Sequence, residues 1–211
     1  MALPKSVVGV LLAGGRSSRM GGGDKCLRLL GGKPILTRII DRLSPQVSDI
    51  VINANGDPSR FAAFGLPVVS DSVGGYQGPL AGVHAGLEWV RANRPDIDHV
   101  VTVATDTPFF PADLVRRFLD APGDASGFRI AQSDLGVHPV IGLWPLGLSE
   151  ALETSLKRGD RKVTTWTEEH GAVPVYFPPI DIGGRSIDPF FNINAPEDLA
   201  AAEALLGERA S

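Results

Sequence analysis

The segment from Val7 to Lys25 constrains the fold more than any other part of this 211-residue chain. An apolar run, Val7 to Ala13, leads directly into a loop that holds five glycines between residues 14 and 23. Glycine allows tight turns and close approach of the backbone to a ligand, and exposed backbone N–H groups bind phosphate oxygens. Three cations and one carboxylate stand in or beside the loop: Arg16, Arg19, Lys25 and Asp24. A buried strand that opens into a cationic, glycine-rich loop indicates a site for a nucleoside triphosphate.

Two better-known phosphate loops do not match this segment. The P-loop requires Gly-Lys-Ser/Thr, whereas Gly23 is followed by Asp24, Lys25 and Cys26. The dinucleotide fingerprint G-x-G-x-x-G fits no register of the glycines between residues 14 and 32. The sequence therefore excludes a Walker-type ATPase and a dinucleotide-dependent dehydrogenase of the usual kind.

Strand-like and helix-like segments alternate along the chain. Apolar, β-rich runs occur at residues 7–12, 50–53, 66–69, 99–104, 128–131, 137–143 and 172–177. The first four are continuous rather than alternating, as in strands that are buried on both faces. Helical patterns follow Pro34 and occupy residues 80–90 and 111–119, and Asn194 is predicted to cap a last helix with Glu197 as its capping-box partner. This order predicts an α/β fold with a doubly wound, mostly parallel sheet.

Composition limits the class of protein. The net charge of −4 and the pI of about 5.5 argue against general nucleic-acid binding. The single cysteine, Cys26, allows no intrachain disulfide and fits a reducing compartment. The apolar run at residues 7–13 is too short to span a membrane. We expect a cytoplasmic protein with neither a nucleic-acid nor a membrane partner.

Polar residues follow several of the predicted strands. Ligands of doubly wound sheets bind outside the carboxyl ends of the strands, and Asn53, Asp71 and Asp106 all lie there. A carboxylate facing a phosphate loop is a hard oxygen ligand for Mg²⁺, which favours metal binding for Asp106. Taken alone, Asp106 is better explained as a turn residue before Pro108, and Asn53 as part of an Asn-rich turn; the glycine loop shifts the balance toward metal binding for Asp106.

Three further residues are candidates for a second substrate. Asn192 and Asn194 are two apart, so they share a face in an extended segment. Asn194 is explained as a helix cap, whereas Asn192 has no such explanation. His138 precedes Pro139 inside a predicted strand and is either a core histidine with a backbone partner or a contact to the second substrate.

The motifs in their order are L-A-G-G-R-S-S-R-M-G with Asp24-Lys25, Asn53-Ala-Asn55, Asp71-Ser72, Gly78-Pro-Leu-Ala-Gly82, Thr105-Asp-Thr-Pro-Phe-Phe-Pro111, His138-Pro139, Arg161-Lys-Val and Phe191-Asn-Ile-Asn-Ala-Pro-Glu-Asp-Leu199. Together they resemble the molybdenum cofactor guanylyltransferase family of the nucleotidyltransferase superfamily, from about Val7 to Leu206. The resemblance implies a three-layer, Rossmann-like nucleotidyltransferase fold. It also implies a single domain over residues 1–211, with a nucleotide-binding half at about 7–110 and an acceptor-binding half at about 111–206.

The resemblance further implies the reaction and its residues. Family members transfer GMP from GTP to the molybdopterin-bound molybdenum cofactor and release pyrophosphate, with Mg²⁺ as cofactor and with molybdoenzymes or their chaperones as receivers of the product. The implied catalytic residues are Lys25, Asp106 and Arg19, and Asp106 is the metal ligand. The implied GTP contacts are Leu12, Ala13, Gly14, Gly15, Lys25, Asn53, Asp71 and Asp106. The implied acceptor contacts are Gly82, His138, Asn192 and Asn194.

Two alternatives remain open at this point. One is an enzyme of the same fold with another base or acceptor: a cytidylyltransferase for the same pterin, or a sugar- or alditol-phosphate nucleotidyltransferase. The other is a nucleotide-binding regulatory or adaptor protein that performs no transfer. Lys25 and Asp106 argue against the second, because binding alone does not require a metal-binding aspartate.

Overall fold

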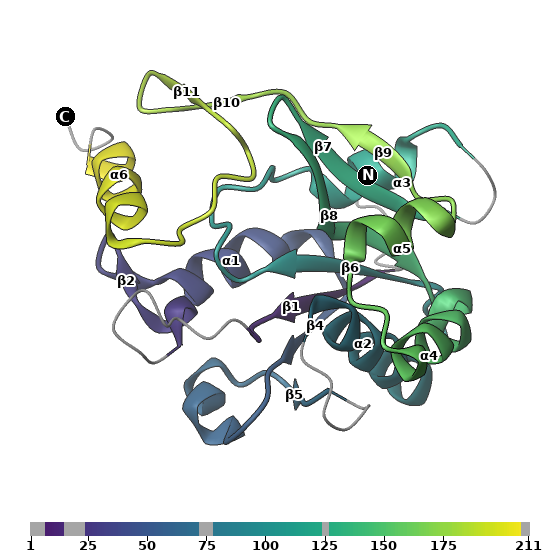
Figure 1. Cartoon of the computed structure of the whole chain (residues 1–211). Coiled ribbons are helices and arrows are strands. Elements are labelled where there is room, and N and C mark those ends of the chain that lie inside the picture. Colours follow the sequence, from purple (N-terminus) through teal and green to yellow (C-terminus); the bar gives the residue numbers. More distant parts are fainter. Residues whose placement is uncertain (1–6, 15–23, 72–77, 124–126, 208–211) are drawn as a thin grey trace.

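The computed structural model describes residues 7–14, 24–71, 78–123 and 127–207 (Figure 1). At its centre lies a seven-stranded sheet in the order β5-β4-β1-β6-β8-β7-β9. These strands are β1 (Val7–Leu12), β4 (Asp49–Asn53), β5 (Val68–Val69), β6 (His99–Ala104), β7 (Arg129–Ser133), β8 (Gly136–Pro145) and β9 (Val173–Tyr176). Within this sheet β8 runs antiparallel to both of its neighbours, while all other neighbouring pairs are parallel. The predicted mostly parallel α/β sheet is confirmed.

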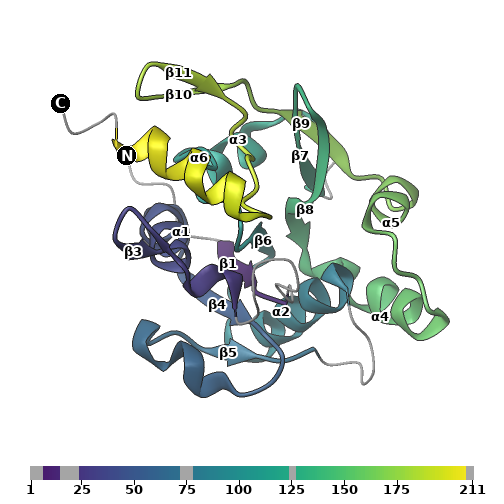
Figure 2. The same cartoon turned by 60° about the vertical axis from the view of Figure 1, so that its left-hand side comes forward.

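Helices cover both faces of the sheet and form the outer two of three layers (Figures 1 and 2). On one face, α1 (Ile35–Leu43), α3 (Leu114–Asp120) and α6 (Pro196–Gly207) contribute to one apolar core. On the other face, α2 (Pro79–Asn93), α4 (Ser149–Arg158) and α5 (Val163–Glu169) contribute to a second core. The sheet separates the two cores, as expected for a doubly wound fold.

The interior strand β1 is buried on both faces. Val7 and Leu11 belong to the core beneath α1, whereas Val8 and Val10 belong to the core beneath α2. The helices approach closely because two positions carry no side chain. A Cβ atom at Gly9 would lie 2.7 Å from Leu43 Cδ2, and one at Gly86 would lie 2.6 Å from Val10 Cγ2. This packing fixes β1, and with it the start of the glycine-rich loop, between two helices.

Short elements complete the described part of the chain. Two hairpins are formed by β2 (Leu29–Leu30) with β3 (Lys33–Pro34), and by β10 (Ile180–Ile182) with β11 (Arg185–Ile187). The 3-10 segments are η2 (Lys25–Leu27), η3 (Ser44–Gln46), η4 (Pro58–Phe64) and η5 (Leu146–Leu148). Along the described ranges, no helix has the length and apolarity needed to cross a membrane.

The predicted capping box of the last helix is wrong in its partners. The carboxylate of Asp198, not that of Glu197, closes the start of α6: its Oδ2 accepts the backbone N–H groups of Asn194 and Ala195, both at 2.8 Å. The side-chain Oδ1 of Asn194 instead accepts a hydrogen bond from the Lys25 ammonium at 2.8 Å. A charged partner makes a stronger hydrogen bond than a neutral N–H group, which favours this arrangement over the cap.

Candidate active site

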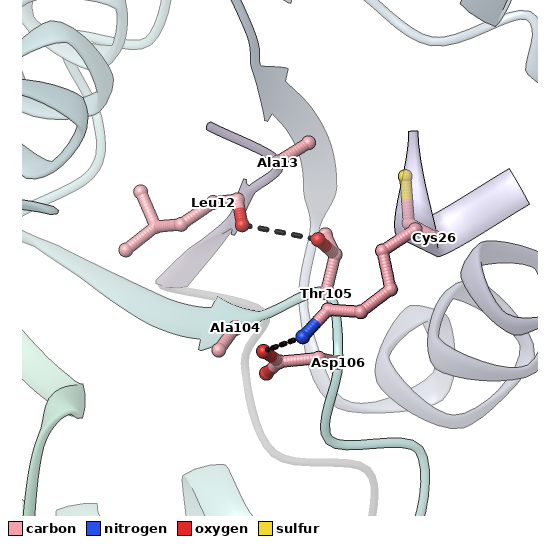
Figure 3. A pocket seen from close by; sticks show the side chains of 7 residues that line it. Leu12, Ala13, Cys26, Ala104, Thr105 and Asp106 are labelled. Carbon is pink, nitrogen blue, oxygen red and sulfur yellow. Dashed lines mark hydrogen bonds and ion pairs between the residues drawn. The ribbon is translucent and has the colours of Figure 1, made fainter. Parts of the chain in front are cut away.

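The carboxyl ends of three parallel strands meet at one edge of the sheet. After β1, the backbone N–H of Ala13 donates to the carbonyl oxygen of Asn53, at the end of β4, over 2.8 Å. Thr105, after β6, donates its hydroxyl to the carbonyl oxygen of Leu12 at 3.1 Å. A pocket lies at this junction (Figure 3), and its lining residues are Leu12, Ala13, Lys25, Cys26, Ala104, Thr105 and Asp106. The structure therefore brings together the strand-end residues that sequence analysis placed on one rim.

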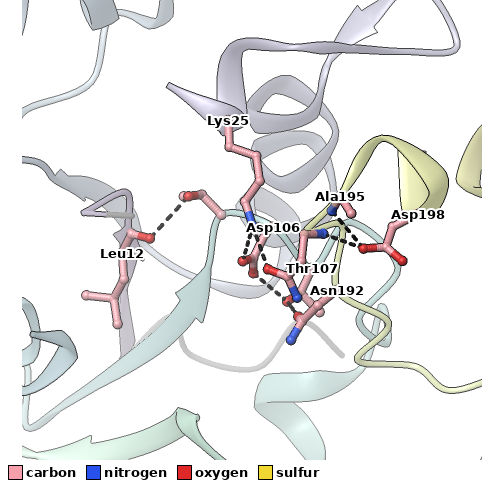
Figure 4. Close-up of polar contacts among 9 residues, drawn as sticks. Leu12, Lys25, Asp106, Thr107, Asn192, Ala195 and Asp198 are labelled. Atoms are coloured by element: carbon pink, nitrogen blue, oxygen red, sulfur yellow. Dashed lines mark hydrogen bonds and ion pairs between the residues drawn. The ribbon is translucent and has the colours of Figure 1, made fainter. Parts of the chain in front are cut away.

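Lys25 stands at the centre of the polar contacts in this pocket. Its Nζ donates to Asp106 Oδ2 and to Asn194 Oδ1, each at 2.8 Å (Figure 4). The Lys25 side chain is 15% exposed and that of Asp106 is 24% exposed, so the ion pair is largely shielded from water. One ammonium thus joins a predicted nucleotide contact to a predicted acceptor contact.

Asp106 fits a metal ion that arrives with a phosphate ligand. Magnesium is usually held by one or two carboxylates together with substrate phosphates, rather than by an all-protein cage. Among the described residues, no three His, Cys, Asp or Glu side chains gather in a way that could hold a metal ion. Asp106 offers a single carboxylate at the pocket, and its Oδ2 already binds the Lys25 ammonium.

A network of amides holds Asp71 beside the pocket. Asn53, which is 3% exposed, donates its Nδ2 to Asp71 Oδ1 at 3.0 Å. Asn55 donates its Nδ2 to Asp71 Oδ2 at 2.8 Å and accepts the Asp71 backbone N–H at 3.0 Å. Both carboxylate oxygens of Asp71 are therefore fixed. Asn53 and Asp71 were predicted as site residues from the sequence, whereas Asn55 was part of the Asn53-Ala-Asn55 motif but not of the predicted GTP contacts.

Gly82 packs behind this network. It lies buried in α2, and a Cβ atom at this position would lie 2.3 Å from Asn53 Oδ1 and 2.9 Å from Leu12 Cδ2. The absence of a side chain lets the helix approach the two nucleotide-side residues. The structure thus gives Gly82 a packing role on the nucleotide side, and its contact with an acceptor stays a prediction.

The segment before α6 is bound to the end of β6. Asn192 Oδ1 accepts a hydrogen bond from the hydroxyl of Thr107 at 2.6 Å (Figure 4). The backbone N–H of Ile193 donates to the carbonyl oxygen of Asp106 at 2.9 Å. Asn192 therefore has a structural partner that sequence analysis did not find. Thr107 gave no signal of its own in the sequence, since a threonine before a proline is an ordinary way to end a strand.

His138 lies in β8, close to the same C-terminal segment. Its Nε2 is 2.7 Å from Ser133 Oγ, and the centroid of its ring is 4.7 Å from that of Phe190. Burial lowers the pKa of His138 below its ordinary value, although the negative charge of Asp188 acts in the opposite direction. The imidazole is therefore neutral near pH 7, and its partner is a side-chain hydroxyl rather than a backbone group.

Cys26 lines the pocket but is a poor nucleophile. Burial, followed by the nearby charge of Asp24, raises the pKa of its thiol to about 11. The thiolate is the reactive form of cysteine, so Cys26 remains protonated at neutral pH. The chemistry of this pocket has to come from its charges.

Two of the predicted site residues, Gly15 and Arg19, lie outside the described residues. Gly14 is exposed at the end of the described part of the first loop. The other predicted residues all lie among the described ones. They are Leu12, Ala13, Lys25 and Asp106 at the pocket, Asn53 and Asp71 beside it, Gly82 behind Asn53, Asn192 and Asn194 on the segment that contacts Thr107 and Lys25, and His138 against Phe190 of that segment.

Known proteins are similar to this chain in sequence over most of its length. A family model described as a MobA-like NTP transferase domain matches residues 9–173. The chain is 48% identical over 202 residues to a molybdenum cofactor guanylyltransferase of Bradyrhizobium sp., covering 95% of this chain and 93% of that protein. It is 48% identical to a protein of the same name from Mesorhizobium japonicum, covering 96% and 97% of the two chains.

Solved structures share the fold. The crystal structure of molybdopterin-guanine dinucleotide biosynthesis protein A from Archaeoglobus fulgidus has a TM-score of 0.69 at 23% identity and covers 95% of this chain and 99% of that one. A Mycobacterium tuberculosis protein solved as a complex with manganese has a TM-score of 0.65 at 17% identity, covering 94% and 98%. From the family match and the near full-length identity to curated relatives, this chain belongs to the MobA-like NTP transferase family, which includes the molybdenum cofactor guanylyltransferases.

Proposed function

We propose that this protein is a molybdenum cofactor guanylyltransferase, which transfers GMP from GTP to the phosphate of the molybdopterin-bound molybdenum cofactor. The observation that carries the proposal is the position of the Lys25 ammonium, which contacts Asp106 and Asn194 at once. A transfer between two polyanions needs a cation where the reacting phosphates meet. The names and the 48% identity of the curated relatives support the choice of both substrates.

The reaction needs no covalent intermediate on the protein. An oxygen of the acceptor phosphate attacks the α-phosphorus of GTP, the bond from that phosphorus to the oxygen of the β-phosphate breaks, and pyrophosphate leaves. The acceptor oxygen is already ionised and requires no general base. Lys25 stabilises the negative charge that develops as the bond breaks, and Arg19 and the glycine-loop amides are proposed to assist it.

The remaining contacts divide between the two substrates. On the GTP side, Leu12 to Gly15, Asn53 and Asp71 hold the nucleoside and phosphates in this proposal. Asn192, Asn194 and His138 orient the pterin in this proposal, which is supported by the contacts of Asn192 with Thr107, of Asn194 with Lys25 and of His138 with Phe190 of the same segment. Placing both reactants in fixed geometry accounts for a large part of the acceleration in such transfers.

Asp106 is the proposed ligand of a divalent ion, with Mg²⁺ as the cofactor. When bound, the ion neutralises charge on the phosphate oxygens and polarises the α-phosphate. A structural neighbour solved with manganese supports a divalent ion in this fold. Molybdoenzymes or their chaperones as receivers of the product, and a cytoplasmic location, remain expectations.

Measurement of pyrophosphate release tests the proposal. Purified protein with Mg²⁺ is supplied with GTP or CTP, each with and without molybdenum cofactor. We expect release only with GTP and acceptor together. Release with CTP instead would identify a cytidylyltransferase, and binding of GTP without any release would identify a nucleotide-binding protein that does no transfer.

A further inference from the structure

Arg60 joins two parts of the candidate active site that are far apart in the sequence. Its Nε lies 2.8 Å from Asp24 Oδ2, in the residue that precedes Lys25. Its Nη2 donates to the carbonyl oxygen of Asn55 at 2.6 Å. The Arg60 and Asp24 side chains are 31% and 21% exposed, so the ion pair is partly shielded from water.

Arg60 projects from a firmly held segment, η4. Asp57 caps the start of η4 by accepting the backbone N–H of Ser59 at 2.9 Å. Phe61 is fully buried, and Gly65 ends the segment with a φ of 63°. The guanidinium carbon of Arg60 also lies 5.0 Å from the centroid of the Phe61 ring. The Arg60 side chain thus packs on the ring of the core residue Phe61. This contact lowers the conformational entropy that the side chain loses when it makes its other contacts.

The carboxylate of Asp24 is available to Arg60 because it does not cap its own helix. Asp24 is the N-cap residue of η2, yet its side chain makes no capping hydrogen bond. An aspartate at this position ordinarily accepts an N–H group of the first turn. Here the ion pair with Arg60 fixes where η2 begins, and Lys25 is the first residue of η2.

The other contact of Arg60 leads to Asp71. Asn55, whose carbonyl oxygen Arg60 holds, binds Asp71 through both ends of its side-chain amide. The guanidinium therefore connects the position of Lys25 to that of Asp71 through one residue on each side. The contact with Asp24 is a charge pair, because the Nε–H of Arg60 makes no hydrogen bond among the described atoms, whereas the Nη2 N–H donates directly to Asn55. One planar guanidinium thus holds one partner by charge and the other by a directed hydrogen bond.

We propose that Arg60 is a positioning residue for GTP binding, which sets Lys25 and Asp71 relative to each other through Asp24 and Asn55. The inference rests on the proposed function, in which Lys25 and Asp71 contact GTP. Arg60 acts through these neighbours rather than at the reacting atoms.

The test is calorimetric titration of GTP with Mg²⁺ into the wild-type protein and the Arg60→Ala variant, with urea unfolding of both. We expect Kd for GTP to rise about two- to fivefold, the range that a partly exposed ion pair supports. Arg117→Ala is the matched control: Arg117 also pairs its Nε with a carboxylate, Asp113 at 2.9 Å, and lies 5.6 Å from a phenylalanine ring centroid. It carries the same charge but lies on α3, so its loss should leave Kd unchanged.

Two further variants separate positioning from simple charge. Asp24→Ala removes a negative charge beside a phosphate-binding lysine, so a pure charge effect would tighten GTP binding, whereas loss of positioning weakens it. Arg60→Lys keeps the charge but not the forked geometry, so it should bind GTP as weakly as Arg60→Ala. The double variant Arg60→Ala/Asp24→Ala should lose about as much as either single variant, since the two residues act as one pair.

The outcomes are distinguishable from a failure of the proposed function. If the wild-type protein bound GTP but Arg60→Ala bound it equally well, the positioning role would be wrong and the proposed function would stand. If Asp24→Ala bound GTP more tightly than the wild type, or if Arg60→Lys bound it as tightly as the wild type, Arg60 would act only through its charge and the positioning role would be wrong. If the wild-type protein neither bound GTP nor released pyrophosphate from it, the proposed function itself would fail.

Discussion

At the scale of single residues, the ion pair between Lys25 and Asp106 sets the state of the site before nucleotide binds. The carboxylate that would hold the proposed metal, that of Asp106, binds the Lys25 ammonium through its Oδ2 at 2.8 Å. An ammonium and a divalent ion near one carboxylate repel each other, so they compete. In the proposed reaction, the phosphates of bound GTP would offer Lys25 another partner and would free Asp106 for the metal.

Because of this competition, we predict that one substitution, Lys25→Ala, raises the affinity for a metal ion and lowers the affinity for GTP. Lys25→Ala should bind Mn²⁺ about fivefold more tightly than the wild type in the absence of nucleotide, the effect of one partly exposed ion pair. The same variant should bind GTP more weakly. Free Mn²⁺ measured by electron paramagnetic resonance reports the first effect, and calorimetry reports the second.

Lys33→Ala is the control for that experiment, because Lys33 pairs with Asp41 at 3.7 Å on the surface, where both side chains are about 60% exposed. It should change neither affinity. Unchanged or weaker Mn²⁺ binding by Lys25→Ala would show that the two cations do not share Asp106.

The kinds of residue in the site were predictable from the sequence, but their pairings were not. A glycine-rich loop that ends in Lys25, and an aspartate at a strand end, each indicate phosphate chemistry by composition and place. The bond between Lys25 and Asn194 spans 169 positions of the chain, and no local pattern encodes it. Arg60 was missed for the same reason, since its role depends on a fold that brings η4 beside η2.

At the scale of elements, α2 lies against the sheet through glycines on one face. Gly82 and Gly86 are one turn apart, and each lacks room for a Cβ atom. Gly86 faces Val10 in the core, whereas Gly82 faces Asn53 and Leu12 at the active site. Both substitutions to alanine should crowd the helix, but with different consequences.

We predict that Gly86→Ala destabilises the protein without changing GTP affinity. Overpacking costs about 1–3 kcal/mol, more than the gain of about 1 kcal/mol from the better helix propensity of alanine. Gly82→Ala should both destabilise the protein and weaken GTP binding, because the crowded atom belongs to Asn53. Urea unfolding and GTP titration of the two variants measure both effects.

Gly207→Ala is the control, because nothing lies within 4 Å of a Cβ atom there and no positive φ is required. It should leave the free energy of unfolding unchanged or slightly increased. Equal loss of GTP affinity in the Gly82 and Gly86 variants would mean that α2 moves as a whole and that Gly82 has no special relation to the site.

The sequence predicted the long elements better than the short ones. The bounds of β1 and β6 coincide with their apolar runs, because strands buried on both faces must be apolar throughout. The helices α4 and α5 were not predicted. In α4 the buried apolar side chains are Leu152 and Leu156, which is too few for a visible helical period. The strands of the two hairpins are two or three residues long, which is too short for a hydrophobic period to be visible, although Leu30 and Ile182 are buried in the core.

At the scale of the whole molecule, the segment before the last helix packs against the site that residues near the start of the chain form. The segment that holds Asn192 and Asn194 contacts Thr107, after the end of β6, and Lys25 in η2, so the two proposed substrate regions are joined directly. His138 lies against Phe190 of the same segment. Stability of this half of the protein should therefore respond to the charge state of His138.

His84, which is buried, and His138, which is partly buried, give the stability of the fold a dependence on pH whose sign follows from their pKa shifts. Burial lowers the pKa of both His84 and His138 below the ordinary value. At pH values below about 6.5 the unfolded chain therefore binds more protons than the folded chain. The free energy of unfolding thus rises with pH in this range and stops rising above it, once both states have lost these protons. Asp57 and Asp96 have lowered pKa values, and the stability that they contribute is lost only as the pH falls below about 4.

The change in stability between about pH 7.5 and pH 5.5 should therefore report the two imidazoles. Urea unfolding at both pH values should show a smaller free energy of unfolding at the lower one. His138→Gln and His84→Gln should each reduce that difference, because neither glutamine takes up a proton. His138→Gln should also make pterin transfer less sensitive to pH in the same window, whereas His84→Gln, which lies in α2, should not. A wild-type protein that gained stability on acidification would show that these histidines are charged in the fold.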